Sequence, residues 1–256
     1  MLGQGIAIYT NEFRDTLPPG RLPKIDSRNA YATINGGRKY RPMFVAMMST
    51  AVGMPPFTDP KAYATDTDMF GEAGDTQNYS SSLYYCPSTP EWTDERNGSY
   101  GYNYQFLGNS RLVNSSDPAS YKHWPVPASW IRHPGRTIAV GDCLGTAASF
   151  APSARQPYLN NGKDAQRVGC EGFNLDPPRV DPTNGEMADA PEHRTAIDAR
   201  HRGRGNVLRV DGHADTQTLV QFGYKLNPDG SIALDGNNAQ WSGNGLDVPW
   251  TLAFTP

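Results

Sequence analysis

Imidazole and carboxylate side chains gather in one short stretch of the chain. His193, His201, Asp211 and His213 fall within 21 residues of sequence, and Glu192 lies beside the first of them. Neutral imidazoles and carboxylates are the ligands with which catalytic zinc and non-haem iron centres are built. One hypothesis is therefore a metal-dependent hydrolase that uses these three histidines and Asp211. The spacings match no standard metal-hydrolase motif, so the competing interpretation is that these side chains only shape a loop.

The elements that position these side chains are two β-prone runs joined by Asp211-Gly212. A basic, glycine-rich loop leads into the first run, and the second run follows the Asp-Gly pair. We expect strands near 206–210 and 213–220, joined by a type I′ turn in which both turn residues have positive φ. His201 could hydrogen-bond this hairpin or a neighbouring loop and so stabilise the region.

The composition indicates a loop-rich globular protein. Hydrophobic residues make up 37% of the 256 residues, and the chain has 26 glycines and 22 prolines. The net charge of −3 and the lack of a concentrated basic face argue against a nucleic-acid partner. We expect no cofactor. Four acidic residues could bind Ca²⁺, but their spacing is not that of an EF-hand loop and a solvated acidic surface is the preferred interpretation; they are Asp66, Asp68, Glu72 and Asp75.

Two segments have the pattern of helices. Leu2, Ile6, Tyr9 and Phe13 share one helical face, and the prolines that follow Leu17 end this segment. A second helix is expected over 42–52, with proline in its first turn and glycine at its end. The longest mostly apolar run, 43–52, is about half of the ~20 residues that a membrane-spanning helix needs.

Further strands are expected near 83–86, 100–104 and 137–140, which makes the fold class α+β. Tyr100, Tyr102 and Tyr104 alternate with small or polar residues and should share one strand face. Such a face could stack on a carbohydrate, which would make the protein an extracellular glycan- or ligand-binding module. The other interpretation is a half-buried sheet face. Two long segments, 54–82 and 143–198, are expected to be loop-rich insertions.

The chain has three cysteines and no Cys-x-x-Cys pair. They are Cys86, Cys143 and Cys170. A zinc ribbon or thioredoxin-type site is therefore not expected. An oxidising compartment would allow one disulfide, and three buried free thiols are an equally good interpretation.

The His201-x9-Asp211-Gly212 spacing resembles the signature of a family of prepilin-type processing-associated proteins, which are pseudopilin-like envelope proteins of planctomycete-type bacteria. Four other stretches are similar to segments of this family: 2–20, the Cys-Pro-Ser at 86–88 with 99–104, the Thr-Ile-x-x-x-Asp strand with its Pro-Gly turn at 134–142, and 238–250. The chain departs from the family pattern at Gly135, where serine is usual. It also lacks the cleavage motif and the hydrophobic half of the N-terminal helix.

The resemblance implies a single pilin-like domain over 1–256, in which residues 1–17 are the remnant of a longer helix packed on an antiparallel sheet. It implies a structural subunit, not an enzyme, of a cell-envelope filament or a type II secretion-like assembly. The partners would be copies of itself or related pilin-like subunits. The missing helix would anchor the protein in the inner membrane, with the domain at the cell surface or in the periplasm. His201, Asp211 and Gly212 mark membership and carry no known catalytic role.

Overall fold

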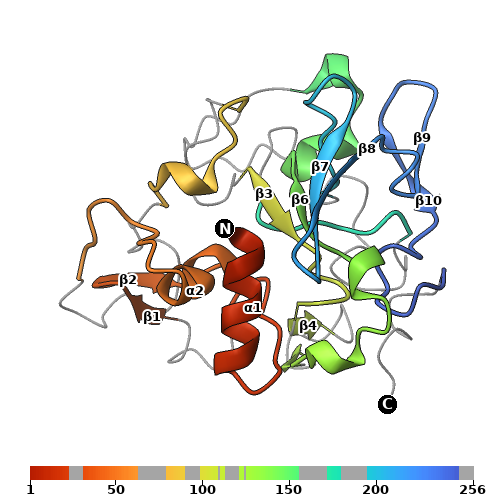
Figure 1. The fold of residues 1–256 in the computed structure, drawn as a ribbon. Coiled ribbons are helices and arrows are strands. Elements are labelled where there is room, and N and C mark those ends of the chain that lie inside the picture. The colour runs from red at the N-terminus through yellow and green to blue at the C-terminus, as the bar shows by residue number, and fades with distance from the viewer. Residues whose placement is uncertain are drawn as a thin grey trace.

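The structure, a computed structural model, has the α+β architecture predicted from the sequence. It describes the residues 1–22, 31–62, 79–89, 99–108, 110–112, 121–123, 125–155, 172–179 and 195–247. Two α-helices pack beside a four-stranded antiparallel sheet, and three two-stranded hairpins lie around them (Figure 1). Within these ranges no helix has the length and apolar character that crossing a membrane requires.

The first helix, α1 (Leu2–Glu12), packs against α2 (Phe44–Ala51), and both lie close to their predicted positions. Ile6 and Tyr9 of α1 are buried, as the helical periodicity predicts. Phe13, expected on the same face, is 52% exposed, although its ring stacks on Tyr9 with 4.2 Å between centroids. The helix ends before Phe13, so this residue leaves the helical register and covers Tyr9 from the solvent side.

The central sheet has the strand order β3-β6-β7-β8 and is antiparallel throughout. Its strands are β3 (Tyr100–Tyr102), β6 (Ile138–Asp142), β7 (Gly205–Arg209) and β8 (Ala214–Gln217). All five residues of β6 are buried, because β6 lies between two strands and is covered by the core. The predictions for 100–104, 137–140, 206–210 and 213–220 thus correspond to strands, and the observed strands are shorter at several ends.

The hairpin between β7 and β8 exists, but its turn is not the predicted type I′. Only Gly212 of the Asp-Gly pair has a positive φ, of 94°. Its N–H donates to the carbonyl of Arg209, whose own N–H donates to the carbonyl of His213. This is a three-residue loop, in which a type I turn is followed by a left-handed glycine. One more residue enters the loop than was predicted, because Val210 leaves the ladder.

Three hairpins surround the sheet: β1 (Tyr31–Ile34) with β2 (Gly37–Tyr40), β4 (Ser110–Leu112) with β5 (Tyr121–His123), and β9 (Tyr224–Leu226) with β10 (Ile232–Gly236). Short 3-10 helices occupy Ser82–Tyr84, Ala128–Trp130, Pro134–Arg136, Gly145–Ser149 and Pro152–Ala154. The prediction of a strand near 83–86 is wrong, because residues Ser82–Tyr84 form the first of these 3-10 helices.

The two predicted insertions are only partly described. Within 54–82 and 143–198, residues 63–78, 156–171 and 180–194 lie outside the described ranges. Apart from β-bridges at single residues and 3-10 turns, the described parts are irregular, as their composition predicts.

The C-terminal segment closes one end of the core around Trp241. This indole is fully buried, and its Nε1–H donates to the carbonyl of Phe222 at 2.9 Å. The buried amide of Asn103 joins this segment to the sheet, because it donates to the carbonyls of both Ile138 and Trp241. A buried amide that is satisfied in this way fixes the relative position of the groups it connects.

Candidate functional site

The two parts of the His201-x9-Asp211-Gly212 spacing lie at opposite ends of β7. His201 is in the loop before the strand, and Asp211 is in the turn after it. At about 3.3 Å per residue, a strand of this length separates its ends by roughly 15 Å. His201 and Asp211 therefore belong to two different clusters.

The loop that holds His201 is a tight turn with its own hydrogen bonds. The N–H of His201 donates to the carbonyl of Arg204 at 3.0 Å, and the N–H of Arg204 donates back to the carbonyl of His201 at 3.2 Å. Arg202 and Gly203 between them have positive φ values of 56° and 79°. The Gly-rich sequence of this loop permits the turn, which aims the imidazole toward the end of β6.

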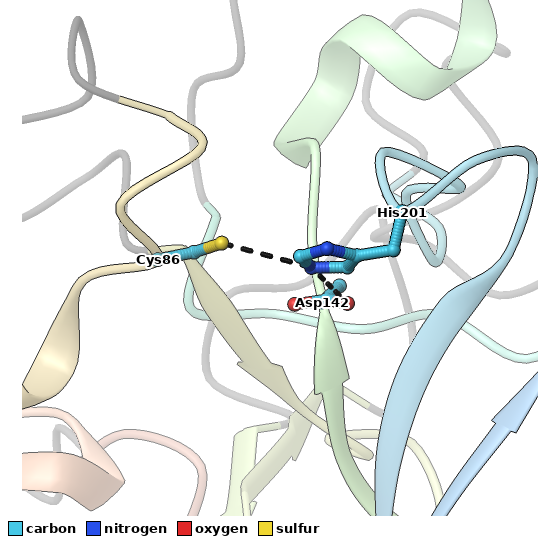
Figure 2. Close-up of side chains that lie close together, drawn as sticks. All are labelled: Cys86, Asp142 and His201. Atoms are coloured by element: carbon cyan, nitrogen blue, oxygen red, sulfur yellow. Dashed lines mark hydrogen bonds and ion pairs between the residues drawn. The ribbon is translucent and has the colours of Figure 1, made fainter.

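The imidazole meets two other side chains, Asp142 at the end of β6 and Cys86 from the segment before β3. Nε2 of His201 lies 3.2 Å from Oδ2 of Asp142 and 3.7 Å from Sγ of Cys86. Figure 2 shows the three side chains pointing toward one another from three separate segments. Cys86 and Asp142 are buried, and the side chain of His201 is 32% exposed.

Asp142 is a carboxylate in an almost fully buried position, with 1% of its surface exposed. Desolvation raises the pKa of Asp142, and this effect exceeds the opposing hydrogen bond from Asn206 and the nearby charges of Arg200 and His201. The hydrogen bond is short, since the N–H of Asn206 donates to Oδ2 at 2.7 Å. Asp142 thus joins the end of β6 to the start of β7 and to the His201 loop.

Arg200 ties the same loop to its surroundings on the other side. Its guanidinium pairs with Asp198 at 2.8 Å and donates to Thr89 Oγ1 at 3.1 Å and to the carbonyl of Cys143. The charge of Arg200 is therefore compensated locally. Because Thr89 follows Cys86 by three residues, Arg200 and His201 both hold the segment 79–89 against the sheet.

This arrangement differs from a nucleophilic Cys-His-Asp triad. In such a triad the base uses one ring nitrogen for the nucleophile and the other for the orienting carboxylate. Here both Cys86 and Asp142 contact the same nitrogen, Nε2. The carboxylate cannot orient the ring for proton transfer from the thiol in this geometry, so the cluster does not support acyl-transfer chemistry.

At the other end of β7, Asp211 and His213 form an exposed pair. Nδ1 of His213 lies 2.7 Å from Oδ1 of Asp211, and the backbone N–H of His213 donates to the same oxygen. Slight desolvation acts to raise the pKa of Asp211, but the hydrogen bonds from His213 outweigh it and lower that pKa. The pair stabilises the hairpin turn.

The structure does not assemble the predicted hydrolase site. His193 lies outside the described residues, and His201 is separated from Asp211 and His213 by the length of β7. In the described part of the chain, a group of three or more cysteine, histidine or acidic side chains with the spacing of metal ligands is found at Cys86, Asp142 and His201. The acidic residues considered for Ca²⁺, from Asp66 to Asp75, lie outside the described ranges.

The three tyrosines predicted to share a strand face lie mostly in the core. Tyr102 is fully buried, Tyr104 is 5% exposed, and Tyr100 is half-buried. Tyr104 lies beyond the end of β3, in the turn that follows. The ring of Tyr102 stacks on Phe44 of α2. Tyr102 and Tyr104 are therefore packed in the core, and Tyr100 keeps part of its surface exposed.

Two of the three cysteines are described, and both are free thiols in buried positions. Cys143 donates its Sγ–H to the carbonyl of Asn174 at 3.1 Å and accepts from the N–H of Gly145. Burial raises the pKa of Cys143 to about 12. Cys86 and Cys143 therefore form no disulfide with each other, and Cys170 lies outside the described residues.

Sequence reasoning identified His201 but missed both side chains that it contacts. A signal was present, because Cys86 opens the Cys-Pro-Ser stretch and Asp142 closes the Thr-Ile-x-x-x-Asp stretch. The fold brings together three residues from three of the stretches on which the family resemblance depends.

Comparison of the chain with models of protein families, with curated proteins and with solved structures found no match.

Proposed function

We propose that this protein is a structural, pilin-like subunit of a cell-envelope filament or type II secretion-like assembly, and that it performs no catalysis. The observation that carries the proposal is the placement of α1. Figure 1 shows α1 between α2 and the four-stranded antiparallel sheet. An N-terminal helix that packs on such a sheet with one face, and leaves the other free, is an element through which neighbouring subunits can join.

The buried face of α1 lies close to the backbones of its neighbours. A Cβ built on Gly5 would lie 3.2 Å from Cβ of Met48 in α2, and one built on Gly3 would lie 3.0 Å from the carbonyl oxygen of Gly212. Glycines at these two positions let the helix backbone approach both α2 and the β7–β8 turn. The two glycines that weaken the helix locally are thus explained by its packing.

The outer face of α1 retains apolar side chains. Ile8 is 37% exposed and Phe13, just after the helix, is 52% exposed. Single exposed apolar residues are common on protein surfaces. The exposed face of α1 is the contact surface for another subunit in this proposal.

The roles of the motif residues also favour a structural function. His201 holds the loop before β7, and Gly212 forms the turn after it. Both therefore fix the central hairpin of the sheet and do not converge on a substrate. In this proposal the partners are copies of the chain or related pilin-like subunits outside the cytoplasmic membrane, as the family resemblance implies.

Site-specific photo-crosslinking in the source cells tests the proposal. A photoreactive amino acid replaces Ile8 on the outer face of α1, and the control variant carries it at Val220, an exposed apolar residue in the loop after β8. We expect adducts between copies of the chain, or with related subunits, from position 8 and few from position 220. Equal labelling from both positions, or none from position 8, would contradict the proposed role of α1.

A further inference from the structure

We propose that Cys86, Asp142 and His201 form a binding site for Zn²⁺ that ties the segment 79–89 to the ends of β6 and β7. This inference does not depend on the pilin-like function and can be tested separately. It begins from the fact that one thiol, one carboxylate and one imidazole offer ligand atoms that all lie within 4.8 Å of one another.

The hydrogen-bonding capacity of His201 is the first argument. Nε2 of an imidazole has either one proton to donate or one lone pair to accept with. Two groups approach this single nitrogen, Oδ2 of Asp142 at 3.2 Å and Sγ of Cys86 at 3.7 Å. Either protonation state of Nε2 can serve only one of them well. A cation placed between the three groups receives one lone pair from each and resolves this competition.

The distances are the second argument. With Zn–S near 2.3 Å and Zn–N and Zn–O near 2.1 Å, a tetrahedral centre places sulfur about 3.6 Å from nitrogen and nitrogen about 3.4 Å from oxygen. The corresponding separations here are 3.7 Å and 3.2 Å. These two separations are within a few tenths of an ångström of those in a tetrahedral zinc centre, and the third, between Sγ of Cys86 and the carboxylate of Asp142, is within 4.8 Å.

Charge and ligand type favour zinc over the cations that prefer oxygen ligands. A thiolate and a carboxylate together carry two negative charges, which match a divalent cation. A thiolate with an imidazole selects zinc over Mg²⁺ and Ca²⁺, which prefer oxygen ligands. The nearby guanidinium of Arg200 does not oppose the cation strongly, because Asp198 pairs with it at 2.8 Å.

The surroundings supply what a zinc site needs beyond its ligands. Asp142 is held by the N–H of Asn206, and the His201 loop is closed by its hydrogen bonds with Arg204. The hydrogen bond to the carboxylate is of the kind that orients metal ligands and raises affinity. In this proposal a water molecule takes the fourth position, which it can reach from the side of His201, whose side chain is 32% exposed. The bound ion would then join three segments that are distant in sequence.

Metal titration of the full chain tests the proposal. The protein is stripped with a chelator under reducing conditions, and Zn²⁺ is added in competition with a chromogenic chelator. We expect one zinc per chain, and Cys86→Ser should weaken its binding at least about 100-fold. Co²⁺ in the wild-type chain should give the intense visible bands of a tetrahedral site and a thiolate-to-cobalt charge-transfer band.

The matched control is His213→Ala, which removes a histidine that also lies beside an aspartate but far from Cys86. Zinc should raise the melting temperature of the wild type and of this control, and should not raise that of Cys86→Ser. Circular dichroism verifies that each variant is folded. Co²⁺ spectra of the wild-type chain without a thiolate band, or zinc affinity equal in the wild type and in folded Cys86→Ser, would overturn the proposal.

Discussion

His201 is best understood as a residue that stabilises the fold through buried partners. Its imidazole is the group through which Asp142, buried at the end of β6, reaches the loop before β7. A buried carboxylate that loses a partner is still desolvated. Removal of the histidine should therefore lower the free energy of unfolding.

We expect His201→Ala to lower the free energy of unfolding by about 1–3 kcal/mol, since Asp142 would lose its imidazole partner in a buried position. Denaturant unfolding of the metal-free protein measures this. The comparison is His213→Ala, which removes an exposed imidazole and should cost less than about 1 kcal/mol. Equal losses in the two variants would show that the buried contact contributes no more to stability than the exposed one.

The ion pair between Arg209 of β7 and Asp215 of β8 should make the stability of the protein depend on pH. The guanidinium is buried, and its Nη2 lies 2.8 Å from Oδ2 of Asp215. The hydrogen bond from Arg209 is the largest cause that lowers the pKa of Asp215. A carboxyl group with a lowered folded-state pKa contributes stability above its unfolded pKa, and this contribution is lost as the pH falls through the folded value.

Asp215→Asn should therefore be less stable than the wild type by about 1–3 kcal/mol at pH 7, and the difference should shrink as the pH falls below about 4. Urea unfolding at pH 7 and at pH 3 measures both differences. Glu12→Gln at an exposed position of α1 serves as the control. A difference that stays constant over this range would rule out the proposed ionic contribution.

At the scale of elements, the β7–β8 hairpin depends on one glycine. Gly212 has a φ of 94°, and a Cβ added there would meet no heavy atom within 4 Å. Backbone conformation alone, and not crowding, therefore sets the cost of a substitution.

Gly212→Ala should destabilise the protein by about 1–2 kcal/mol, because L-residues are strained at positive φ. Gly212→Asn should cost less, since asparagine tolerates this region. Thermal melts of the two variants give the comparison. Two substitutions with the same melting temperature as the wild type would show that the turn can relax to another conformation.

The packing of α1 on α2 depends on Gly5 in the same way. Its added Cβ would lie 3.2 Å from Cβ of Met48, and a β-branched side chain adds further atoms in this space. We expect Gly5→Val to cost about 1–3 kcal/mol by overpacking. The control is Ile8→Val on the outer face, which should be nearly neutral. If Gly5→Val unfolds at the denaturant concentration of the wild type, the close approach of the two helices is not required.

The elements differ in how far the sequence predicts them. Both helices were predicted because proline and glycine mark their ends and apolar residues share one face. The β1–β2 hairpin was missed although its Asn35-Gly36 turn, with φ values of 49° and 81°, has the positive φ values that a type I′ turn requires at both positions. The Asp211-Gly212 pair adopts a different turn. There the N–H of Arg209 pairs with the carbonyl of His213, and the N–H of Val210 donates to the carbonyl of Thr137, a contact that is distant in sequence.

At the scale of the molecule, the sequence predicts the α+β class and most of the central sheet, but not the cluster at His201. The spacing of apolar residues predicts which face of a helix or strand is buried. It does not predict which side chains that are distant in sequence come into contact. Asp142 meets His201 because β6 and β7 are neighbours in the sheet, and strand order cannot be derived from local propensities. The same limit explains why His201, Asp211 and His213 were grouped wrongly by their nearness in sequence.

The proposed structural role predicts that this chain occurs in the cell as part of an ordered assembly. Electron microscopy of envelope material from the source organism, with mass analysis of the isolated assemblies, tests this most directly. We expect ordered filaments or layers in which this chain is a major subunit. A discrete monomer that is released from the cells and carries out hydrolysis would contradict the structural account.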